Sequence, residues 1–397
     1  MVKLLKMNDD DGPTEKPSSA QIVVSNDDLL IQIIQLLPLK SLVQFRLVSN
    51  HWNTLILDSK LLSRNRPAVG LFLEGLDLPH GTPNSYIIFL DKSTDRPFRM
   101  INRFKDPWCR HCKIIDSCNG LLLCVSNEAY NITPKYYVCN PTTKKYVAIP
   151  QLVSDHSTES ICGMFLGFDP SKSPHYNVVC VMRSLSGMLH LFEVYSSETG
   201  SWRRGGELFK AYTHFDFEEG VYWNRAIHWF NIESRPREYD YFDTGMVAKP
   251  REPVYFNLDC DQTPKVFPKP PLKDKCYERN DYSFGESCDH LHFVDAKSPL
   301  AEFIVYEMRR DYSEWFVKYK VSTPEMKKDI VPKVCGRYTV VVRGKNDKDC
   351  FLVIAIGKRI VRYNFEQKTY ELLCDLDGSA YWGAQCPLQY IESLSSV

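Results

Sequence analysis

Residues 192–202, FEVYSSETGSW, contain a short apolar strand, a polar turn and an aromatic residue that opens a return strand. The same pattern recurs in residues 137–146, YVCNPTTKKY, and in residues 360–370, IVRYNFEQKTY. Related strands at 255–259 and 305–308 give a spacing of about 50 to 60 residues between units. A repeat of that length with a hairpin in each unit is typical of the blades of a β-propeller.

The stretch after Pro67 follows this pattern to the end of the sequence. Short runs rich in Val, Ile, Tyr and Phe alternate with turns of Gly, Pro, Asn and Asp, and no amphipathic helix of about ten or more residues interrupts them. Residues 67–397 are long enough for six units of about 55 residues. We therefore predict a mainly β fold with a propeller of six blades, while five or seven stay open. Closing the ring can use a strand from one terminus, and the segment from Tyr381 onwards is the candidate.

A small helical module is expected before Pro67. Residues 1–24 are polar, acidic in the middle and interrupted by two prolines, which predicts a disordered leader. Ser25 is followed three residues later by Asp28, a helix-start signal, and apolar residues then recur at helical spacing. We predict a first helix that ends at Pro38, a second from about Pro38 to Val48, and a third capped by Ser49. The expected domains are 1–24, 25–66 and 67–397.

Composition narrows the possible partners and compartments. The chain has 49 basic and 49 acidic residues, so no overall field would hold nucleic acid or an anionic membrane. No run approaches the roughly 18 apolar residues that a membrane-spanning helix needs, and the N-terminus lacks the apolar region of a secretory signal. We expect a cytoplasmic or nuclear protein, with reduced cysteines and with no nucleic-acid or membrane partner.

Chemical motifs are few. Cys109-Arg110-His111-Cys112 is the string most like a zinc site, but no second ligand pair follows at a usable distance, which favours ordinary loop thiols. His290 and His292 would share one face of a strand, and strand packing is the favoured explanation because no carboxylate pattern accompanies them. No nucleophile elbow, phosphate-binding loop or His-Glu-x-x-His is present. We predict no catalytic residue, no metal and no cofactor.

Two stretches resemble a known family. Residues 25–42, SNDDLLIQIIQLLPLKSL, continued by 43–56, VQFRLVSNHWNTLI, resemble an F-box, with its Leu-Pro-Leu-Lys-Ser-Leu core and a Trp three residues after Ser49. Residues 117–122, SCNGLL, and 220–229, GVYWNRAIHW, resemble the plant F-box-associated, kelch-like propeller.

The resemblance implies a non-catalytic substrate-recognition subunit of a Skp–cullin–F-box ubiquitin ligase. The helices would bind a Skp-type adaptor and, through it, a cullin, while the propeller would present an unidentified target protein for ubiquitination and proteasomal degradation. We place the adaptor contact on the apolar face formed by Leu30, Ile33, Ile34, Leu37, Pro38, Leu42, Val48 and Trp52. Some of these must instead hold the helices together, and the pattern alone does not separate the two groups.

The target-binding prediction rests on an insertion at about 231–253. It carries Arg237, Tyr239 and Tyr241, residue types that often anchor protein interfaces, against the alternative of a solvated loop. Two other interpretations of the chain stay open. The helices can be a lid packed on the β domain, or the whole chain can be a propeller enzyme or carbohydrate-binding propeller with a helical appendage.

Overall fold

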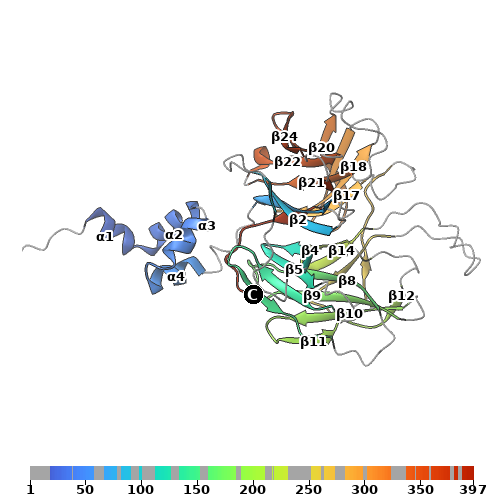
Figure 1. Cartoon of the computed structure of the whole chain (residues 1–397), viewed down its shortest axis with the longest axis horizontal. Coiled ribbons are helices and arrows are strands. Elements are labelled where there is room, and N and C mark those ends of the chain that lie inside the picture. The colour runs from blue at the N-terminus through green and yellow to red at the C-terminus, as the bar shows by residue number, and fades with distance from the viewer. Residues whose placement is uncertain are drawn as a thin grey trace, which may run out of the picture. The chain divides into compact units, whose positions relative to one another are not determined.

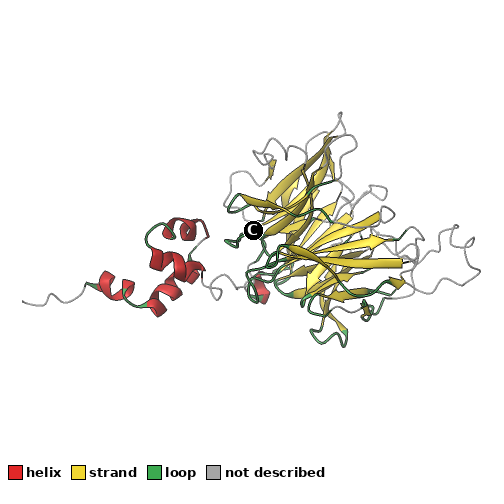
Figure 2. Ribbon diagram, turned by 90° about the horizontal axis from the view of Figure 1, so that it is seen from below, coloured by secondary structure: helices red, strands yellow, loops and turns green. Residues whose placement is uncertain are grey.

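The computed structural model divides the chain into two compact units, Met1–Leu62 and Ser63–Val397. The structure describes residues 18–37, 39–57, 67–77, 82–90, 98–100, 112–126, 134–152, 160–184, 189–210, 217, 219–230, 252–260, 263–272, 282–297, 302–322, 337–344, 346–356, 359–375, 380–382 and 387–397. In the described residues the first unit is helical and the second is built almost entirely of strands (Figure 2).

The described part of the first unit contains four short helices, which are α1 (Ser19–Val24), α2 (Asp27–Leu36), α3 (Leu39–Phe45) and α4 (Asn50–Leu57). The helix α1 falls within the predicted disordered leader, so that prediction is wrong for residues 19–24. The acidic run and the two prolines on which the leader prediction rests, Pro13 and Pro17, all precede this helix.

Side-chain caps set where two of these helices begin. Asn26, not Ser25, caps α2, because its side-chain oxygen accepts a hydrogen bond from the backbone N–H of Leu29 at 3.2 Å. Ser49 caps α4 as predicted and accepts from the N–H of Trp52 at 3.2 Å. The second predicted helix is shorter than expected, since α3 ends at Phe45 and residues 46–48 form a turn.

The second unit consists of six antiparallel sheets, so the prediction of a six-bladed propeller is confirmed (Figure 1). The first three blades contain β1 (Gly70–Asp77), β2 (Thr82–Phe89) and β3 (Phe98–Met100); β4 (Cys112–Cys118), β5 (Leu121–Ser126), β6 (Tyr136–Asn140) and β7 (Lys145–Ala148); and β8 (Ser160–Gly167), β9 (Asn177–Arg183), β10 (Leu189–Ser196), β11 (Ser201–Arg204) and β12 (Phe209–Lys210). The last three contain β13 (Gly220–Trp223), β14 (Ala226–Trp229), β15 (Val254–Asn257) and β16 (Lys265–Val266); β17 (Tyr282–Ser287), β18 (His290–Lys297), β19 (Glu302–Met308) and β20 (Trp315–Ser322); and β21 (Arg337–Val342), β22 (Phe351–Ile356), β23 (Arg359–Asn364) and β24 (Thr369–Asp375).

Strands from the C-terminal end close the ring. Both β25 (Ala380–Trp382) and β26 (Leu388–Tyr390) pair with β1, so the first blade combines the two ends of the propeller sequence. The residues that follow β26 then run along the second blade. The side-chain amide of Asn140 donates to the carbonyl oxygens of Ser393 at 3.1 Å and Ser395 at 2.7 Å. Gly120 lies against this tail with φ +89°, and a side chain there would collide with Ser393.

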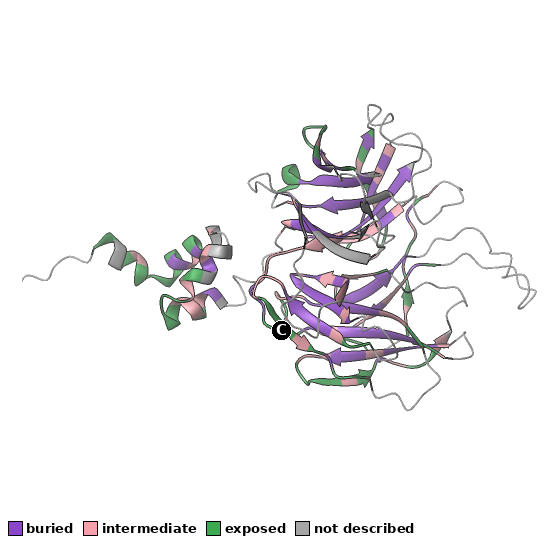
Figure 3. Ribbon diagram, viewed as in Figure 1, coloured by how far each residue is buried: buried purple, intermediate pink, exposed green. Residues whose placement is uncertain are grey.

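Six apolar clusters hold the blades together, one between each neighbouring pair. Between the second and third blades, for example, Leu121 packs with Val178, and between the third and fourth blades Phe192 packs with Trp229. Figure 3 shows buried segments in strands throughout the propeller, and β5, β9, β10 and β14 are buried along most of their length. In the described residues each blade therefore packs both of its faces against the adjacent blades, as expected of a closed ring.

The cysteines depart from the sequence expectation at one position. Nine described cysteines are free thiols, whereas Cys112 is disulfide-bonded. The prediction that all thiols are reduced is therefore wrong at Cys112, whose neighbours at 109–111 lie outside the described residues.

Candidate protein-binding surfaces

The apolar stripe of α2 divides into an inward and an outward row. Leu30 and Ile34 are 1% exposed, and they form the core of the helical unit with Leu42 and Ile56. One position earlier in each turn, Leu29 is 38% exposed and Ile33 is 43% exposed. Residues four apart lie on the same side of a helix, so the two rows face different directions.

Of the predicted adaptor residues, the structure therefore buries Leu30, Ile34 and Leu42 in the core and leaves Ile33 and Val48 exposed. Leu37 and Trp52 are partly exposed, and Trp52 packs edge-on against Phe45 with ring centroids 5.3 Å apart. Pro38 lies outside the described residues. Sequence reasoning missed Leu47, which is 87% exposed in the turn between α3 and α4.

Polar contacts brace these helices. His51 of α4 contacts the carboxylate of Asp27 at the start of α2, with Nε2 and Oδ1 2.8 Å apart. The Nε of Arg46 donates to the side-chain oxygen of Asn53 at 2.9 Å and so connects the turn to α4. The exposed apolar residues are thereby carried on helices whose relative geometry is fixed within the unit.

In the propeller, a cavity of about 140 Å³ lies where the innermost strands meet. Its lining comes from β4, β8, β13, β17, β21 and β26, one strand from each blade, and from β18 behind β17. The lining therefore identifies this cavity as the central channel of the ring. It is lined by apolar side chains and by ionisable ones, among them Asp116, Glu286 and His292.

A larger polar cavity of about 460 Å³ shares Asn119, Tyr222 and Glu286 with the channel, and we call it the mouth. It is lined mainly by turns between the first two strands of neighbouring blades. Three of these turns have two successive residues with positive φ, at 119–120, 224–225 and 288–289. That backbone is the two-residue hairpin turn whose twist matches the strands, and it places the turn residues at the rim.

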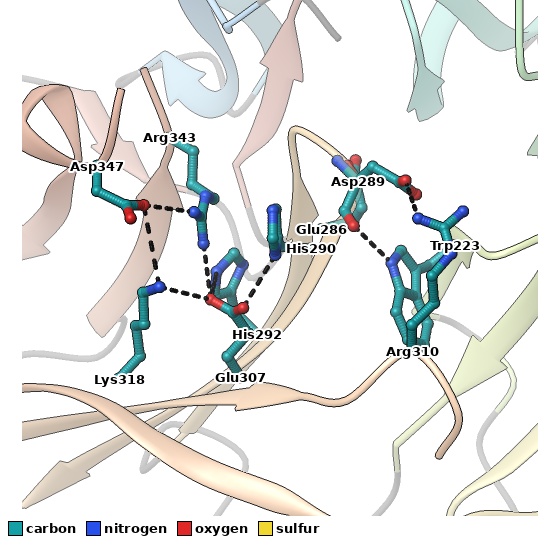
Figure 4. A network of polar contacts seen from close by, with 10 residues as sticks. All are labelled: Trp223, Glu286, Asp289, His290, His292, Glu307, Arg310, Lys318, Arg343 and Asp347. Atoms are coloured by element: carbon teal, nitrogen blue, oxygen red, sulfur yellow. Dashed lines mark hydrogen bonds and ion pairs between the residues drawn. The ribbon is translucent and has the colours of Figure 1, made fainter. Parts of the chain in front are cut away.

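Ion pairs join the rim turns to outer turns of the same blades. The guanidinium of Arg225 contacts Asp259 at 2.6 Å, and that of Arg310 contacts Asp289. The indole N–H of Trp223 donates to the carbonyl oxygen of Asp289 at 2.9 Å and connects the fourth and fifth blades (Figure 4). The rim is therefore well organised, with both arginines already paired.

Two carboxyl groups of the channel have raised pKa values. Burial raises the pKa of Asp116 to about 7, against hydrogen bonds from the backbone N–H groups of Leu166 and Ser117, both at 2.7 Å. Burial also raises the pKa of Glu286 to about 7, and the nearby charges of Asp289 and Asp169 add to the rise. Glu286 accepts one hydrogen bond from the N–H of Asp289 at 2.5 Å.

The two histidines of β18 share a face, as the sequence predicted, and both approach Glu307 of β19 (Figure 4). Nδ1 of His290 lies 2.9 Å from Glu307, whereas Nε2 of His292 is 3.7 Å away, beyond hydrogen-bonding distance. Arg343 binds the same carboxylate at 2.6 Å. Burial opposes ionisation, but contacts with the two histidines lower the pKa of Glu307.

This charge network weighs against a metal ion at the His pair. Arg343 and Lys318 both lie near Glu307 and neutralise the carboxylate that a cation would need. Among the residues that the structure describes, no group of His, Cys, Asp and Glu is arranged to hold a metal ion. Of the zinc-like string, residues 109–111 lie outside the described residues and Cys112 is disulfide-bonded.

The predicted target-binding residues Arg237, Tyr239 and Tyr241 also lie outside the described residues. Their segment connects β14 to β15, so it leaves β14 at the end opposite the turn between β13 and β14 that lines the mouth. No motif or spacing in the sequence indicates the residues that line the mouth. Glu286 is one of 49 acids, and only the assembled ring shows which turns meet there.

Family models match both units: the F-box domain over residues 26–64 and the F-box associated beta propeller domain over residues 89–262. The chain is a plant F-box protein with a propeller domain. F-box protein At5g07610 of Arabidopsis thaliana is 29% identical to it, over 96% of this chain and 94% of the relative. F-box protein At5g49610 of the same plant is 25% identical, over 51% of this chain and 57% of the relative.

Solved structures resemble this F-box protein only distantly. An oligogalacturonate lyase from Vibrio parahaemolyticus gives a TM-score of 0.41 at 10% identity, over 80% of this chain and 78% of that one. TolB from Acinetobacter baumannii gives 0.39 at 10% identity, over 87% and 71%. Likenesses at this distance assign no activity.

The two domains and the F-box relatives support a general role as a substrate-recognition subunit, which is a receptor role and not a catalytic one. No helix in the described ranges combines the length and the apolar character that a membrane crossing requires.

Proposed function

We propose that this F-box protein binds a Skp-type adaptor through its helical unit and a target protein through its propeller, within a Skp–cullin–F-box ubiquitin ligase. The chain makes no covalent bond in this scheme. It raises the effective concentration of target lysines near the conjugating enzyme, so that ubiquitin is transferred and the target is degraded by the proteasome.

The observation that carries the adaptor proposal is the outward apolar row on a braced helical unit. Leu29, Ile33, Leu47 and Val48 expose apolar surface that none of the unit's described residues covers. Exposed apolar surface of this kind marks a protein contact, because its exposure to water costs free energy that a partner would recover. We assign the contact to these residues together with Leu37, Pro38 and Trp52, and we assign Leu30, Ile34 and Leu42 to holding the helices together.

The target surface has two candidate locations in the propeller. One is the insertion with Arg237, Tyr239 and Tyr241, and the other is the mouth at the opposite ends of the strands. Loops on a rigid scaffold are common recognition sites, and both locations qualify. We place the assembly in the cytoplasm or nucleus, with no nucleic acid or membrane as partner.

The test is affinity purification of the tagged full chain from plant cells, with the parent compared with Ile33→Asp plus Val48→Asp. We expect adaptor and cullin to co-purify with the parent and to be lost from the double variant. Retention of both by the variant would move the adaptor surface elsewhere, and their absence from the parent would contradict the proposed assembly.

Two further variants separate the target locations. The triple change Arg237→Ala, Tyr239→Ala and Tyr241→Ala alters the insertion alone, and Asp289→Asn alters the rim of the mouth. Each should retain the adaptor. The variant that loses co-purifying ubiquitinated proteins under proteasome inhibition identifies the face that binds the target.

A further inference from the structure

A row of hydrogen bonds between the fifth and sixth blades is interrupted at Gly285. The hydroxyl oxygen of Ser283 on β17 accepts the backbone N–H of Thr339 on β21 at 3.1 Å. Four residues further along β17, the hydroxyl oxygen of Ser287 accepts the N–H of Arg343 at 3.0 Å. Gly285 lies midway between the two serines and faces the same blade, because alternate residues of a strand share a side. It has no side chain with which to continue the row.

The sixth blade presents a hydrogen-bond donor opposite this interruption. Thr339 and Arg343 both direct their N–H groups at β17, and the backbone groups of alternate residues along a strand point the same way. Val341 lies between them, so its N–H points towards Gly285. Both Val341 and Gly285 line the channel cavity. We call the space between them the gap.

His292 lines the gap from β18, where it is directly paired with Gly285. It is 2% exposed, and neither ring nitrogen has a hydrogen-bond partner among the described residues. Buried polar groups normally find a partner, so an unpartnered ring beside a cavity marks a position for a ligand or a bound water. Burial lowers the pKa of His292, which favours the uncharged ring, with one nitrogen as a donor and the other as an acceptor.

The gap is open, whereas the equivalent place in the fourth blade is filled. There Gly220 of β13 is directly paired with Trp229. A side chain added at Gly220 would collide with the ring of Phe165 at 2.6 Å and with the indole nitrogen of Trp229 at 2.8 Å. A side chain added at Gly285 would meet nothing within 4 Å. The fifth blade therefore leaves room for an occupant that the fourth does not.

The charges around the gap favour an uncharged occupant. On the same face of the blade, Glu307 and Arg343 are already paired with each other at 2.6 Å. Glu286 follows Gly285 but is paired with Leu291 and faces the fourth blade. An ion in the gap would lose its hydration without gaining a free counter-ion. A group that carries an acceptor and a donor side by side, as a primary carboxamide does, would match the N–H of Val341 and the acceptor nitrogen of the histidine ring.

The size and position of the gap limit the occupant further. The cavity of about 140 Å³ is several times the ~30 Å³ share of a water molecule and below the ~300 Å³ of a drug-sized site. Towards the mouth, the side chain of Gln389 crosses the channel. Its Oε1 accepts the hydroxyl of Ser287 at 3.2 Å, and its Nε2 donates to the carbonyl oxygen of Glu286. A target side chain entering from the mouth would have to displace Gln389, so a free small molecule fits better.

We propose that the propeller binds a small uncharged molecule with a carboxamide group in the gap at Gly285. The carbonyl oxygen of the molecule accepts the N–H of Val341, and its amide donates to the ring of His292. This site lies inside the ring, apart from the insertion and the mouth, and it does not depend on the proposed role in a ubiquitin ligase.

The experiment titrates the purified full chain with four probes of nearly the same size and shape, which are acetamide, acetone, acetate and acetamidinium. Saturation-transfer NMR on the methyl protons of each probe gives its affinity. The ring Cε1–H resonance of His292, assigned by its absence from His292→Phe, locates the site. We expect acetamide to bind about fivefold more tightly than acetone, which lacks the donor, and at least about tenfold more tightly than either ion.

Two variants test the two sides of the gap. Gly285→Ser fills the space and supplies an acceptor for the N–H of Val341, so it should weaken acetamide binding at least about tenfold while keeping or raising the Tm. His292→Phe removes both ring nitrogens and should weaken acetamide binding about fivefold. His175→Phe makes the same change at an exposed histidine, and this matched control should bind acetamide as the parent does.

The absence of saturable acetamide binding would overturn the proposal and leave the gap occupied by water only. Similar affinities for all four probes would overturn it as well, and so would unchanged acetamide binding by either variant that folds. These outcomes are distinguishable from failure of the ligase proposal, because probe binding is measured on the isolated chain and adaptor binding is measured in cells.

Discussion

The two units of this F-box protein treat their apolar surface in opposite ways. In the helical unit Leu47 is 87% exposed, and an entire row of α2 faces outward. In the propeller even residues near the C-terminal end are buried. Leu394 is 3% exposed, and the carbonyl oxygens of its neighbours Ser393 and Ser395 bind Asn140 of the second blade. A small three-helix core buries little surface, whereas a closed ring gives every blade two neighbours.

The difference indicates where each unit obtains its stability. The helical unit depends on caps, a short core and, by our proposal, an adaptor that covers the exposed row. The propeller depends on the completeness of its ring, which β25 and β26 provide by pairing with β1. A change in either unit should therefore have an effect that the other unit does not share.

The largest effect is expected from removing the closing strands. A chain that lacks residues 380–397 leaves β1 without its inner partners, and we expect loss of cooperative thermal unfolding and rapid proteolysis. A chain that lacks residues 1–62 should keep its β circular dichroism and a Tm within about 3 °C of the parent. A stable propeller after the C-terminal deletion would show that ring closure is dispensable.

Neighbouring positions on α2 give the next largest effect. Ile34→Asp places a charge in the core and should cost about 3–5 kcal/mol, enough to unfold the helical unit. Ile33→Asp should keep the helices folded and weaken adaptor binding at least tenfold. Helical circular dichroism and adaptor titration check both, with Gln32→Asp as an exposed control on the same helix. Equal behaviour of the two isoleucine variants would contradict the division into rows.

A pH effect is expected in the propeller. Burial lowers the pKa of His228 from 6.5 to about 3, so between these values the unfolded chain binds a proton that the folded chain does not. Stability that His228 contributes at pH 7 is therefore lost as the pH falls. When the pH falls from 7 to 4.5, the free energy of unfolding should fall by about 2 kcal/mol more in the parent than in His228→Phe. The measurement is urea unfolding of both proteins at both pH values. Equal losses of unfolding free energy in the parent and the variant would contradict the lowered pKa of His228.

The smallest effect is expected from a helix cap. Ser49→Ala removes the acceptor for the N–H of Trp52 and should destabilise α4 by about 1 kcal/mol. In the full chain this should speed amide hydrogen exchange in residues 50–57 about fivefold and leave the propeller amides unchanged. Faster exchange in the propeller would mean that the two units are coupled.

Much of the fold could be predicted because its signals are local. The recurring strand, turn and aromatic return strand gave six blades, and the helical spacing in 29–37 gave the helices. The sequence could not show which apolar row of α2 faces outward. Leu29, Leu30, Ile33 and Ile34 are similarly apolar, and only the positions of α3 and α4 distinguish the buried residues from the exposed ones. Capping by Asn26 was missed because Ser25 and Asn26 are both good caps.

The central channel and its mouth could not be predicted from the sequence, and the reason is physical. The residues that line them, such as Glu286 and His292, meet turns and strands of other blades only when the ring closes. Glu286 is flanked in sequence by no unusual pattern, and its raised pKa arises from burial and from Asp289 and Asp169. Contacts between residues that are far apart in the chain produce no periodic pattern in the sequence.

Closure of the ring by β25 and β26 also affects the order in which the protein becomes functional during synthesis. The helical unit is complete once 62 residues have been made, while the propeller must wait for strands that are synthesised after all the others. If the adaptor proposal holds, a nascent or prematurely terminated chain would thus carry an adaptor-binding module with no assembled receptor. Such chains would occupy adaptors without delivering targets, so a nonsense mutation late in the gene would act as a dominant inhibitor and an early one as a simple loss.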